Sequence, residues 1–186
     1  TLHYAKQLIL ENGGKIEDGM LYIKKQEAVP AELEVSFPGV VPKKKVTIDD
    51  EEYWEWKGDW KTVQQANQWE SEEKQKQAEQ EGAEVVFKFN GTGAVLMGRF
   101  DMDCGQVDIF VDGEFYRSKD LYYKMMGWGA GDGWLNGAHL AHVMNLEQGD
   151  HEIKLVISGK KNEKSTGTKL KVATAIIYDS EPEKIR

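Results

Sequence analysis

The sequence predicts an all-β domain, an antiparallel β-sandwich or barrel, and three observations support this. First, short runs such as Val85–Phe89 and Val107–Val111 alternate between two sides, which is the period-two pattern of a half-buried strand. Second, turn sequences with glycine, among them Asn90-Gly91 and Asp112-Gly113, separate these runs. Third, no long apolar helix pattern lies between them, so a parallel α/β sheet is disfavoured.

Composition excludes several classes of protein. A chain of 186 residues is long enough for one good core with a small appendage. Its net charge of -8 disfavours a nucleic acid partner, because clustered Lys and Arg bind phosphate backbones. Cys104 is the only cysteine, so we expect neither a disulfide framework nor a thiolate metal cluster. No run is apolar enough for a membrane span. The chain begins with Thr1 and has no signal peptide, which suggests a processed product or a fragment.

The first residues are predicted to form a small N-terminal unit. Helical spacing of apolar residues predicts a short helix over Thr1–Asn12, and a hairpin is expected over Ile16–Ile23. Glu27–Pro30 has the composition of a linker. Residues 1–30 are therefore either the remnant of a preceding domain or a segment that packs on the sandwich formed by residues 31–186.

The next segment contains one predicted strand and two polar stretches. Leu33–Phe37 alternates and is expected to be the first strand of the sandwich. Lys43–Lys45 is interpreted as solvated surface without a binding role. Ser71–Glu81 is rich in helix formers but has no apolar face, so we expect a weak surface helix or an ordered loop there.

Aromatic residues are dense in a short segment that has few aliphatic ones. They could plug one end of the sandwich as a small core, because Trp is highly buried on average. They could also form a platform on which a ligand stacks. The residues concerned are Tyr53, Trp54, Trp56, Trp60 and Trp69.

The rest of the chain supplies further strands. Ala94–Phe100 returns from the Asn90-Gly91 turn, and Ile153–Ile157 alternates after a glycine-rich interval. Leu170–Tyr178 alternates as the final strand, and Ser158–Gly167 has the composition of an exposed loop.

The interval Leu121–Asn145 breaks the strand pattern and is the predicted ligand site. Glycines permit tight backbone paths there, and aromatic and polar residues are interleaved. Sugar recognition needs this mixture, with a ring against the apolar face of a pyranose and polar groups hydrogen-bonded to its hydroxyls. The same residues could instead cap the sandwich or contact another domain. The candidate ligand-binding residues are Trp128, Trp134, Tyr122, Tyr123, Asp132, Asn136 and His139.

Several of these segments carry a resemblance to a known family. Gly82–Gly93, the nearby Gly98, Val107–Gly113 and Leu146–Leu155 resemble the galactose-binding-like jelly rolls. Such domains occur as carbohydrate-binding modules and as accessory domains of bacterial glycan-acting hydrolases and esterases. The resemblance covers about Leu33 to Tyr178, and its motifs are turns between strands.

The resemblance implies a jelly-roll β-sandwich that acts as a non-catalytic carbohydrate-binding accessory domain. It also allows a structural calcium ion, and an extracytoplasmic location, periplasmic or secreted, is favoured. More weakly, residues 1–60 look like the C-terminal part of bacterial ADP-ribosylglycohydrolase-like proteins that carry such a jelly roll. None of the acidic metal-binding motifs of that family can be matched, so its activity is not carried over.

Metal and catalytic motifs are not evident. His139 and His142 are three residues apart, which on a regular strand places them on opposite faces, so no metal site is expected. Asp101–Gly105 lacks the further acidic ligands of a calcium loop and is interpreted as a turn with exposed carboxylates. The sequence contains no nucleophile elbow, phosphate loop or zinc-protease motif.

The sequence therefore predicts a binding domain rather than an enzyme, without a cofactor and with a carbohydrate as its partner. The alternative is a structural domain that packs against a missing catalytic domain of an ADP-ribosylglycohydrolase-like or glycoside hydrolase protein. In that case the Trp54–Trp69 cluster or the Trp128–Trp134 loop would be an interface.

Overall fold

The computed structural model describes residues 15–17, 20–22, 41–66, 72–124 and 135–179. The chain divides into two compact units, Thr1–Ser36 and Phe37–Arg186. In the first unit, β1 (Lys15–Glu17) and β2 (Met20–Tyr22) pair as an antiparallel hairpin, which confirms that prediction. The helix predicted over Thr1–Asn12 and the strand predicted over Leu33–Phe37 lie outside the described residues. The domain boundary near residue 30 stays a prediction.

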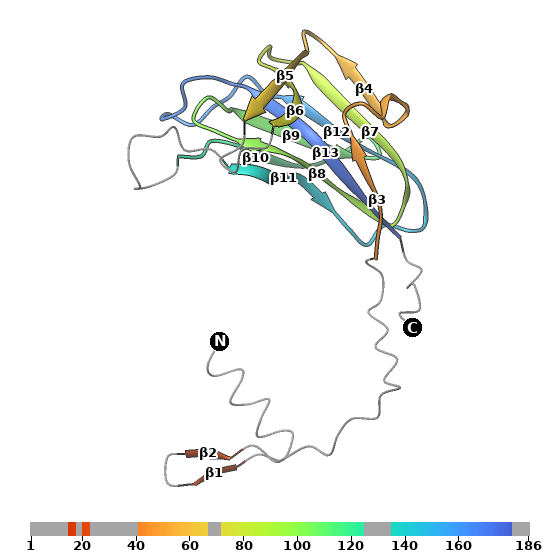
Figure 1. Cartoon of the computed structure of the whole chain (residues 1–186), viewed down its shortest axis with the longest axis vertical. Coiled ribbons are helices and arrows are strands. Elements are labelled where there is room, and N and C mark those ends of the chain that lie inside the picture. Colours follow the sequence, from red (N-terminus) through yellow and green to blue (C-terminus); the bar gives the residue numbers. More distant parts are fainter. Residues whose placement is uncertain (1–14, 18–19, 23–40, 67–71, 125–134, 180–186) are drawn as a thin grey trace. The chain divides into compact units, whose positions relative to one another are not determined.

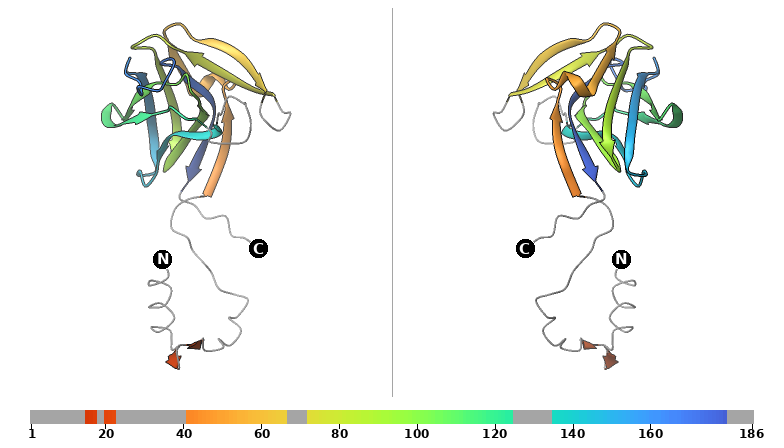
Figure 2. Two further views of the ribbon diagram at one scale, coloured as in Figure 1. Left: turned by 90° about the vertical axis from the view of Figure 1, so that its left-hand side faces the viewer. Right: turned by 90° about the vertical axis from the view of Figure 1, so that its right-hand side faces the viewer.

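The second unit is a sandwich of two antiparallel sheets (Figures 1 and 2). The five-stranded sheet consists, in spatial order, of β10 (Glu114–Asp120), β9 (Gln106–Val111), β12 (Gly149–Ile157), β7 (Glu84–Gly91) and β4 (Trp54–Lys57). The six-stranded sheet consists of β11 (Leu135–Val143), β8 (Gly93–Phe100), β13 (Leu170–Asp179), β6 (Glu72–Ala78) and β5 (Lys61–Ala66), with β3 (Val41–Thr47) also paired to β13.

The strands predicted from alternation within the described residues are confirmed. The chain passes from β7 in one sheet to β8 in the other, returns for β9 and β10, and then alternates through β11, β12 and β13. This is a jelly-roll arrangement, in which consecutive strands switch sheets. The predicted antiparallel β-sandwich is therefore confirmed. No helix in the described part of the chain is long and apolar enough to cross a membrane.

The core lies between the two sheets. Val85 and Phe87 of β7 are fully buried, and Lys88, the next residue, is exposed, so the period-two pattern sets which side faces the core. Leu96 of β8 and Ile109 of β9 are also fully buried. Each such aliphatic or aromatic side chain contributes about 1.5–3 kcal/mol of burial free energy.

The described tryptophans of the aromatic segment belong to this core, so the structural interpretation is confirmed for Trp54, Trp56 and Trp60. Trp54 is 4% exposed, and its Nε1 donates a hydrogen bond to the Thr47 carbonyl at 2.9 Å. Trp56 and Trp60 are partly buried against the core, and their ring centroids lie 4.7 Å apart. Trp69 lies outside the described residues.

The prediction of a surface helix or loop over Ser71–Glu81 is wrong, because most of this stretch is strand β6. β6 pairs with β5 on one side and with β13 on the other, so its backbone groups are satisfied by neighbouring strands. Its polar sequence hides this role, since among residues 74–78, where burial is described, Gln75 and Ala78 are the buried ones.

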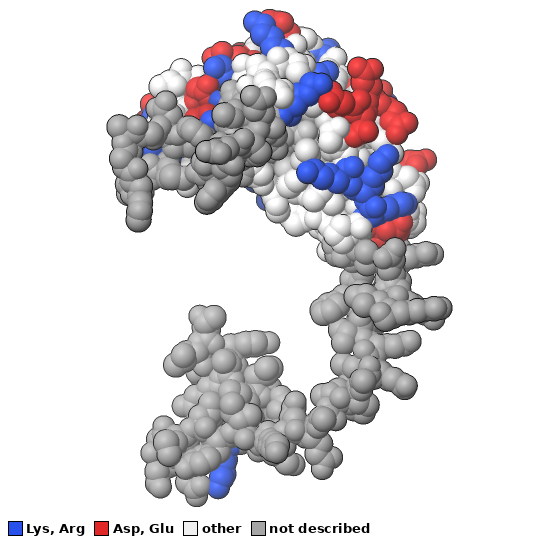
Figure 3. Space-filling view, viewed as in Figure 1, with Lys and Arg blue, Asp and Glu red and all other residues white. Residues whose placement is uncertain are grey.

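Charged residues of both signs lie close together on the sandwich, as Figure 3 shows for the side that carries β3 and β4. Lys44 of β3 is 3.8 Å from Glu52, and Lys74 of β6 is 2.5 Å from Asp49. Lys43, Lys44 and Lys45 are all exposed, so the lysine-rich segment of β3 is solvated surface, as predicted.

Candidate functional site

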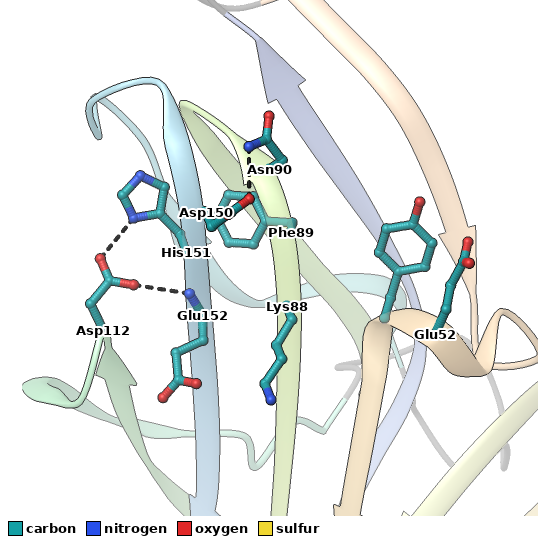
Figure 4. A pocket seen from close by; sticks show the side chains of 9 residues that line it. Glu52, Lys88, Phe89, Asn90, Asp112, Asp150, His151 and Glu152 are labelled. Atoms are coloured by element: carbon teal, nitrogen blue, oxygen red, sulfur yellow. Dashed lines mark hydrogen bonds and ion pairs between the residues drawn. The ribbon is translucent and has the colours of Figure 1, made fainter.

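An open pocket of about 560 Å³ lies at one end of the five-stranded sheet (Figure 4). It is formed where β7 and β12 run side by side, with the turn after β9 on one side and η1 (Glu51–Tyr53) on the other. The lining residues are Glu52, Tyr53, Lys88, Phe89, Asn90, Asp112, Asp150, His151 and Glu152.

The register of two strands places the central residues of the pocket. In the antiparallel pair of β7 and β12, Asn90 lies opposite Asp150 and Lys88 lies opposite Glu152. Side chains that are directly opposite share one face of a sheet. Asn90 Nδ2 donates a hydrogen bond to Asp150 Oδ1 at 2.8 Å, and Asn90 Oδ1 accepts one from Gln148 Nε2 at 3.2 Å. The two strand ends are therefore tied together by side chains.

Asp112 holds the opposite wall. It has a φ of 50° and Gly113 one of 84°, as a two-residue hairpin turn between β9 and β10 requires. Asp112 Oδ1 accepts a hydrogen bond from the Glu152 N–H at 2.9 Å, and its Oδ2 is 2.8 Å from His151 Nδ1. This carboxylate therefore fixes the turn against β12.

Both nitrogens of the His151 ring face acceptors. Nδ1 faces Asp112, and Nε2 lies 2.7 Å from the Glu147 carbonyl oxygen. A neutral imidazole has a single N–H, so satisfying both contacts requires the doubly protonated ring. Burial alone would lower the pKa of His151, but the bonds to Glu147 and Asp112 and the charge of Asp150 outweigh it and raise that pKa.

We expect His151 to titrate above its ordinary pKa of 6.5. Replacing Asp112 by Asn should lower this pKa, because the substitution removes the carboxylate charge and keeps the shape. Since the folded-state pKa is raised, the contribution of His151 to stability is present at low pH and is lost as pH rises through that pKa. NMR titration of the ring protons measures the shift, and an unchanged pKa in D112N would contradict the assignment.

Tyr53 supplies the accessible aromatic wall of the pocket. Its ring is partly buried and stacks on Phe87 with centroids 6.1 Å apart. Lys44 Nζ donates a hydrogen bond to the Tyr53 hydroxyl at 2.8 Å and lies 4.4 Å from the ring centroid. Phe89 also lines the pocket but is only 4% exposed, so Tyr53 is the ring that a ligand could cover.

None of the described residues that were predicted as a ligand site lines this pocket. Trp128, Asp132 and Trp134 lie outside the described residues, so their role stays a prediction. Tyr122 and Tyr123 are half-buried beside Asp101: Tyr122 forms a β-bridge with it, and the Tyr123 N–H donates to the Asp101 carbonyl at 3.1 Å.

Asp101 directly follows β8, whereas the pocket residue Asn90 comes just before β8 begins. The described tyrosines and the pocket therefore lie toward opposite ends of this strand.

Asn136 and His139 are on β11, which runs through the interval that was predicted to be a loop. His139 is exposed and lies opposite Met97 of β8. The prediction that His139 and His142 point to opposite faces is wrong. A β-bulge between His139 and Ala141 adds one residue, so both rings lie on one face, 5.2 Å apart.

The prediction that Asp101–Gly105 exposes its carboxylates is also wrong. Lys171 is 3% exposed, and its Nζ lies 2.8 Å from Asp101 Oδ2 and 2.6 Å from Asp103 Oδ1. Lys169 Nζ is 2.8 Å from Asp103 Oδ2, and Arg99 Nε is 3.2 Å from Asp101 Oδ2. Protein cations thus neutralise the carboxylates that a calcium ion would need. In the described part of the chain, no group of three or more His, Cys, Asp or Glu residues could hold a metal ion.

The pocket was not predicted from the sequence, because Asn90, Asp112 and Asp150 were interpreted as turn residues. Asn90 precedes Gly91, Asp112 precedes Gly113, and Asp150 follows Gly149. The available signal was that three separate glycine turns each carry a polar side chain. Only the pairing of β7 with β12, and of β12 with β9, brings these three turns to one end of a sheet.

Comparison with known proteins supports the fold. No family model matches the sequence, and no curated protein matches it. A crystal structure of a two-domain esterase active on acetylated mannans is similar with a TM-score of 0.51 and 14% identity, over 91% of this chain and 43% of the esterase chain. The same kind of esterase co-crystallized with mannopentaose gives a TM-score of 0.49 and 12% identity, over 76% and 38% of the two chains.

A third similar structure is the CBM36-1 domain of a multidomain xylanase from the hindgut metagenome of Trinervitermes trinervoides. It has a TM-score of 0.41 and 16% identity, over 72% of this chain and 94% of that one. At these identities the likeness shows the fold alone. The chain spans about two fifths of the esterase chains that it matches. Nothing in these comparisons supports the weaker resemblance to ADP-ribosylglycohydrolase-like proteins.

Proposed function

We propose that this chain is a non-catalytic accessory domain that binds a carbohydrate in the pocket at the end of β7 and β12. The observation that carries the proposal is the convergence of hydrogen-bonding side chains beside one accessible aromatic ring. Asn90, Asp150 and Glu152 come from paired strands of a rigid sheet, and Tyr53 forms the wall. The likeness of the fold to part of an esterase active on acetylated mannans supports a glycan as the ligand.

The chemistry of the pocket suits a polyhydroxylated ligand. A sugar hydroxyl both donates and accepts, so it needs acceptors and donors within reach. Carboxylates of Asp150 and Glu152 accept, while the amide of Asn90 and the ammonium of Lys88 donate. The pocket is open, so it can admit the end or the side of a longer glycan. Binding without catalysis is proposed because Asp112 and Asp150 already hold other groups of the sandwich in place.

The proposal predicts that single changes in the pocket weaken glycan binding. In Asp150→Ala or Tyr53→Ala, we expect the Kd for a mannan oligosaccharide to rise about 10-fold or more, the equivalent of about 1.4 kcal/mol. Glu163→Ala, an exposed residue in the loop after β12, is the matched control. A glycan array identifies the ligand, and calorimetry of the three variants measures the change.

If the Asp150, Tyr53 and Glu163 variants bind the oligosaccharide with equal affinity, the pocket is not the binding site. The predicted site within Leu121–Asn145 stays a second proposed site, with Trp128 and Trp134 as its first candidates. If they bind the sugar instead, Trp128→Ala or Trp134→Ala should abolish binding while the thermal transition stays nearly unchanged. A large loss of stability in both variants would place these rings in the core.

A second candidate function is favoured by two exposed aromatic side chains. Phe115 is 60% exposed and Tyr116 is 49% exposed, both on the edge strand β10. Such residues are typical of a contact with another domain. In this alternative the sandwich packs against a catalytic domain of a longer, extracytoplasmic glycan-acting protein. This alternative would be favoured if the sandwich packs against a catalytic domain in the full-length gene product and if Phe115→Ser loosens that packing.

A further inference from the structure

A group of basic side chains lies on strands β10 and β11 and takes no part in the pocket. We call it the basic corner; it consists of Arg117, Lys119, His139 and His142. The bulge in β11 brings the two histidine rings together at 5.2 Å. Lys119 crosses from β10 and donates a hydrogen bond from Nζ to the His139 carbonyl oxygen. The two edge strands are thus joined at this corner.

The charges of the basic corner are not balanced within the described residues. None of its four members forms an ion pair with a described carboxylate, whereas Lys57, Lys88 and Lys171 each pair with one or more. The pKa of His142 is lowered, first by burial and then by the electrostatic effect of His139, Arg117 and Lys119. The pKa of Lys119 is lowered as well, first by burial and then by the charge of Arg117. Arg117 and Lys119 are therefore the two cations that gather here, on a chain whose net charge is -8, and the lowered pKa leaves the His142 ring neutral at neutral pH.

An exposed aromatic surface adjoins these charges. The guanidinium of Arg117 lies 5.3 Å from the centroid of Tyr116, which is 49% exposed. Next to it, Phe115 is 60% exposed and contacts Phe110 edge-on, with centroids 5.7 Å apart. An uncovered ring suits the apolar face of a pyranose, and Arg presents several donors to a carboxylate or sulfate. The two features together match one acidic sugar residue.

We propose that the basic corner is a second binding site, which takes the carboxylate or sulfate group of an acidic glycan while Tyr116 covers the sugar ring. The proposal rests on the proposed function for the class of ligand, but it uses residues separate from the pocket. An anion at this position would supply the negative charge that the described side chains lack there. The pocket, in contrast, contains the carboxylates of Glu52, Asp112, Asp150 and Glu152 and would repel the same group.

The test titrates the chain with three probes: a polygalacturonate oligosaccharide, a sulfated dextran and a neutral mannan oligosaccharide. In the double variant R117Q/K119Q, we expect affinity for at least one acidic probe to fall about 10-fold or more, with mannan affinity unchanged. K160Q/K161Q, in an exposed loop, removes the same charge and should bind like the unchanged chain. Because Lys119 also packs on Phe100, R117Q alone is measured as well, since Arg117 is exposed.

The outcomes separate the possibilities. A loss for polygalacturonate alone identifies a carboxylate ligand, and a loss for sulfated dextran alone identifies a sulfate. Equal losses in R117Q/K119Q and K160Q/K161Q, or no binding of either acidic probe, would overturn the proposal. If mannan binds and this binding depends on Asp150, but neither acidic probe binds, the pocket remains the proposed site. The proposal for the basic corner is then rejected by itself.

Discussion

Replacing Lys171 by Met is expected to lower the free energy of unfolding by about 3 kcal/mol at neutral pH. Lys171 is 3% exposed and contacts the carboxylates of Asp101 and Asp103. Removing one partner of a buried ion pair costs about 3–5 kcal/mol, because the remaining charge stays desolvated. The lower end applies here, since Arg99 and Lys169 still contact the two carboxylates. Chemical denaturation measures the change.

The effect of Lys171→Met should depend on pH. Burial would raise the pKa of Asp103, but hydrogen bonds from Lys169 and Lys171 outweigh it and lower that pKa. The stability that Asp103 contributes is therefore present at neutral pH and is lost as pH falls through the lowered pKa. The difference between the variant and the unchanged chain should shrink in acid.

Lys161→Met is the matched control for this variant, because Lys161 is exposed. It should be near neutral, within about 0.5 kcal/mol. A Lys171→Met variant as stable as Lys161→Met would mean that the network does not hold the turn after β8.

Replacing Gly98 by Ala is expected to cost about 3 kcal/mol, because β8 and β13 approach each other too closely there for a side chain. A Cβ on Gly98 would lie 1.9 Å from the Lys171 carbonyl oxygen and 2.8 Å from Leu140 Cδ1. The first neighbour is backbone in the middle of the sheet, so it cannot rotate away. The melting temperature should be about 6–12 °C lower for a domain of this size.

Gly149→Ala provides the comparison for Gly98→Ala. A Cβ at Gly149 would meet only the His151 ring, at 3.8 Å, which is ordinary contact. Its melting temperature should stay close to that of the unchanged chain. If both variants melt alike, the close approach of β8 and β13 is not a determinant of stability.

The fold was predictable wherever strands alternate with one side in the core. β7, β9 and β12 show this pattern, and their turns carry glycine, whereas β13 is buried on both faces over most of its length. β6 was not predictable, because backbone pairing with β5 and β13 defines it while most of its side chains are polar. β11 was missed because its bulge interrupts the period of two at His139–Ala141.

The site was less predictable than the fold. Asn90, Asp112 and Asp150 are far apart in the sequence, and each has a sufficient explanation as a turn residue. Their convergence depends on which strands pair, and local sequence does not encode this. The same holds for the basic corner. His139 and His142 were singled out, but the bulge that brings their rings together and the position of Arg117 near them do not follow from local sequence.

A carbohydrate is proposed to bind in the pocket between β7, β12 and the turn after β9. The most direct test is a titration of the isotopically labelled chain with the oligosaccharide that binds best, followed by amide chemical shifts in NMR. We expect saturable shifts centred on Asn90, Asp112 and His151, and these shifts should be absent in Asp150→Ala. Saturable shifts confined to other residues, or no shifts with folded protein, would contradict the claim.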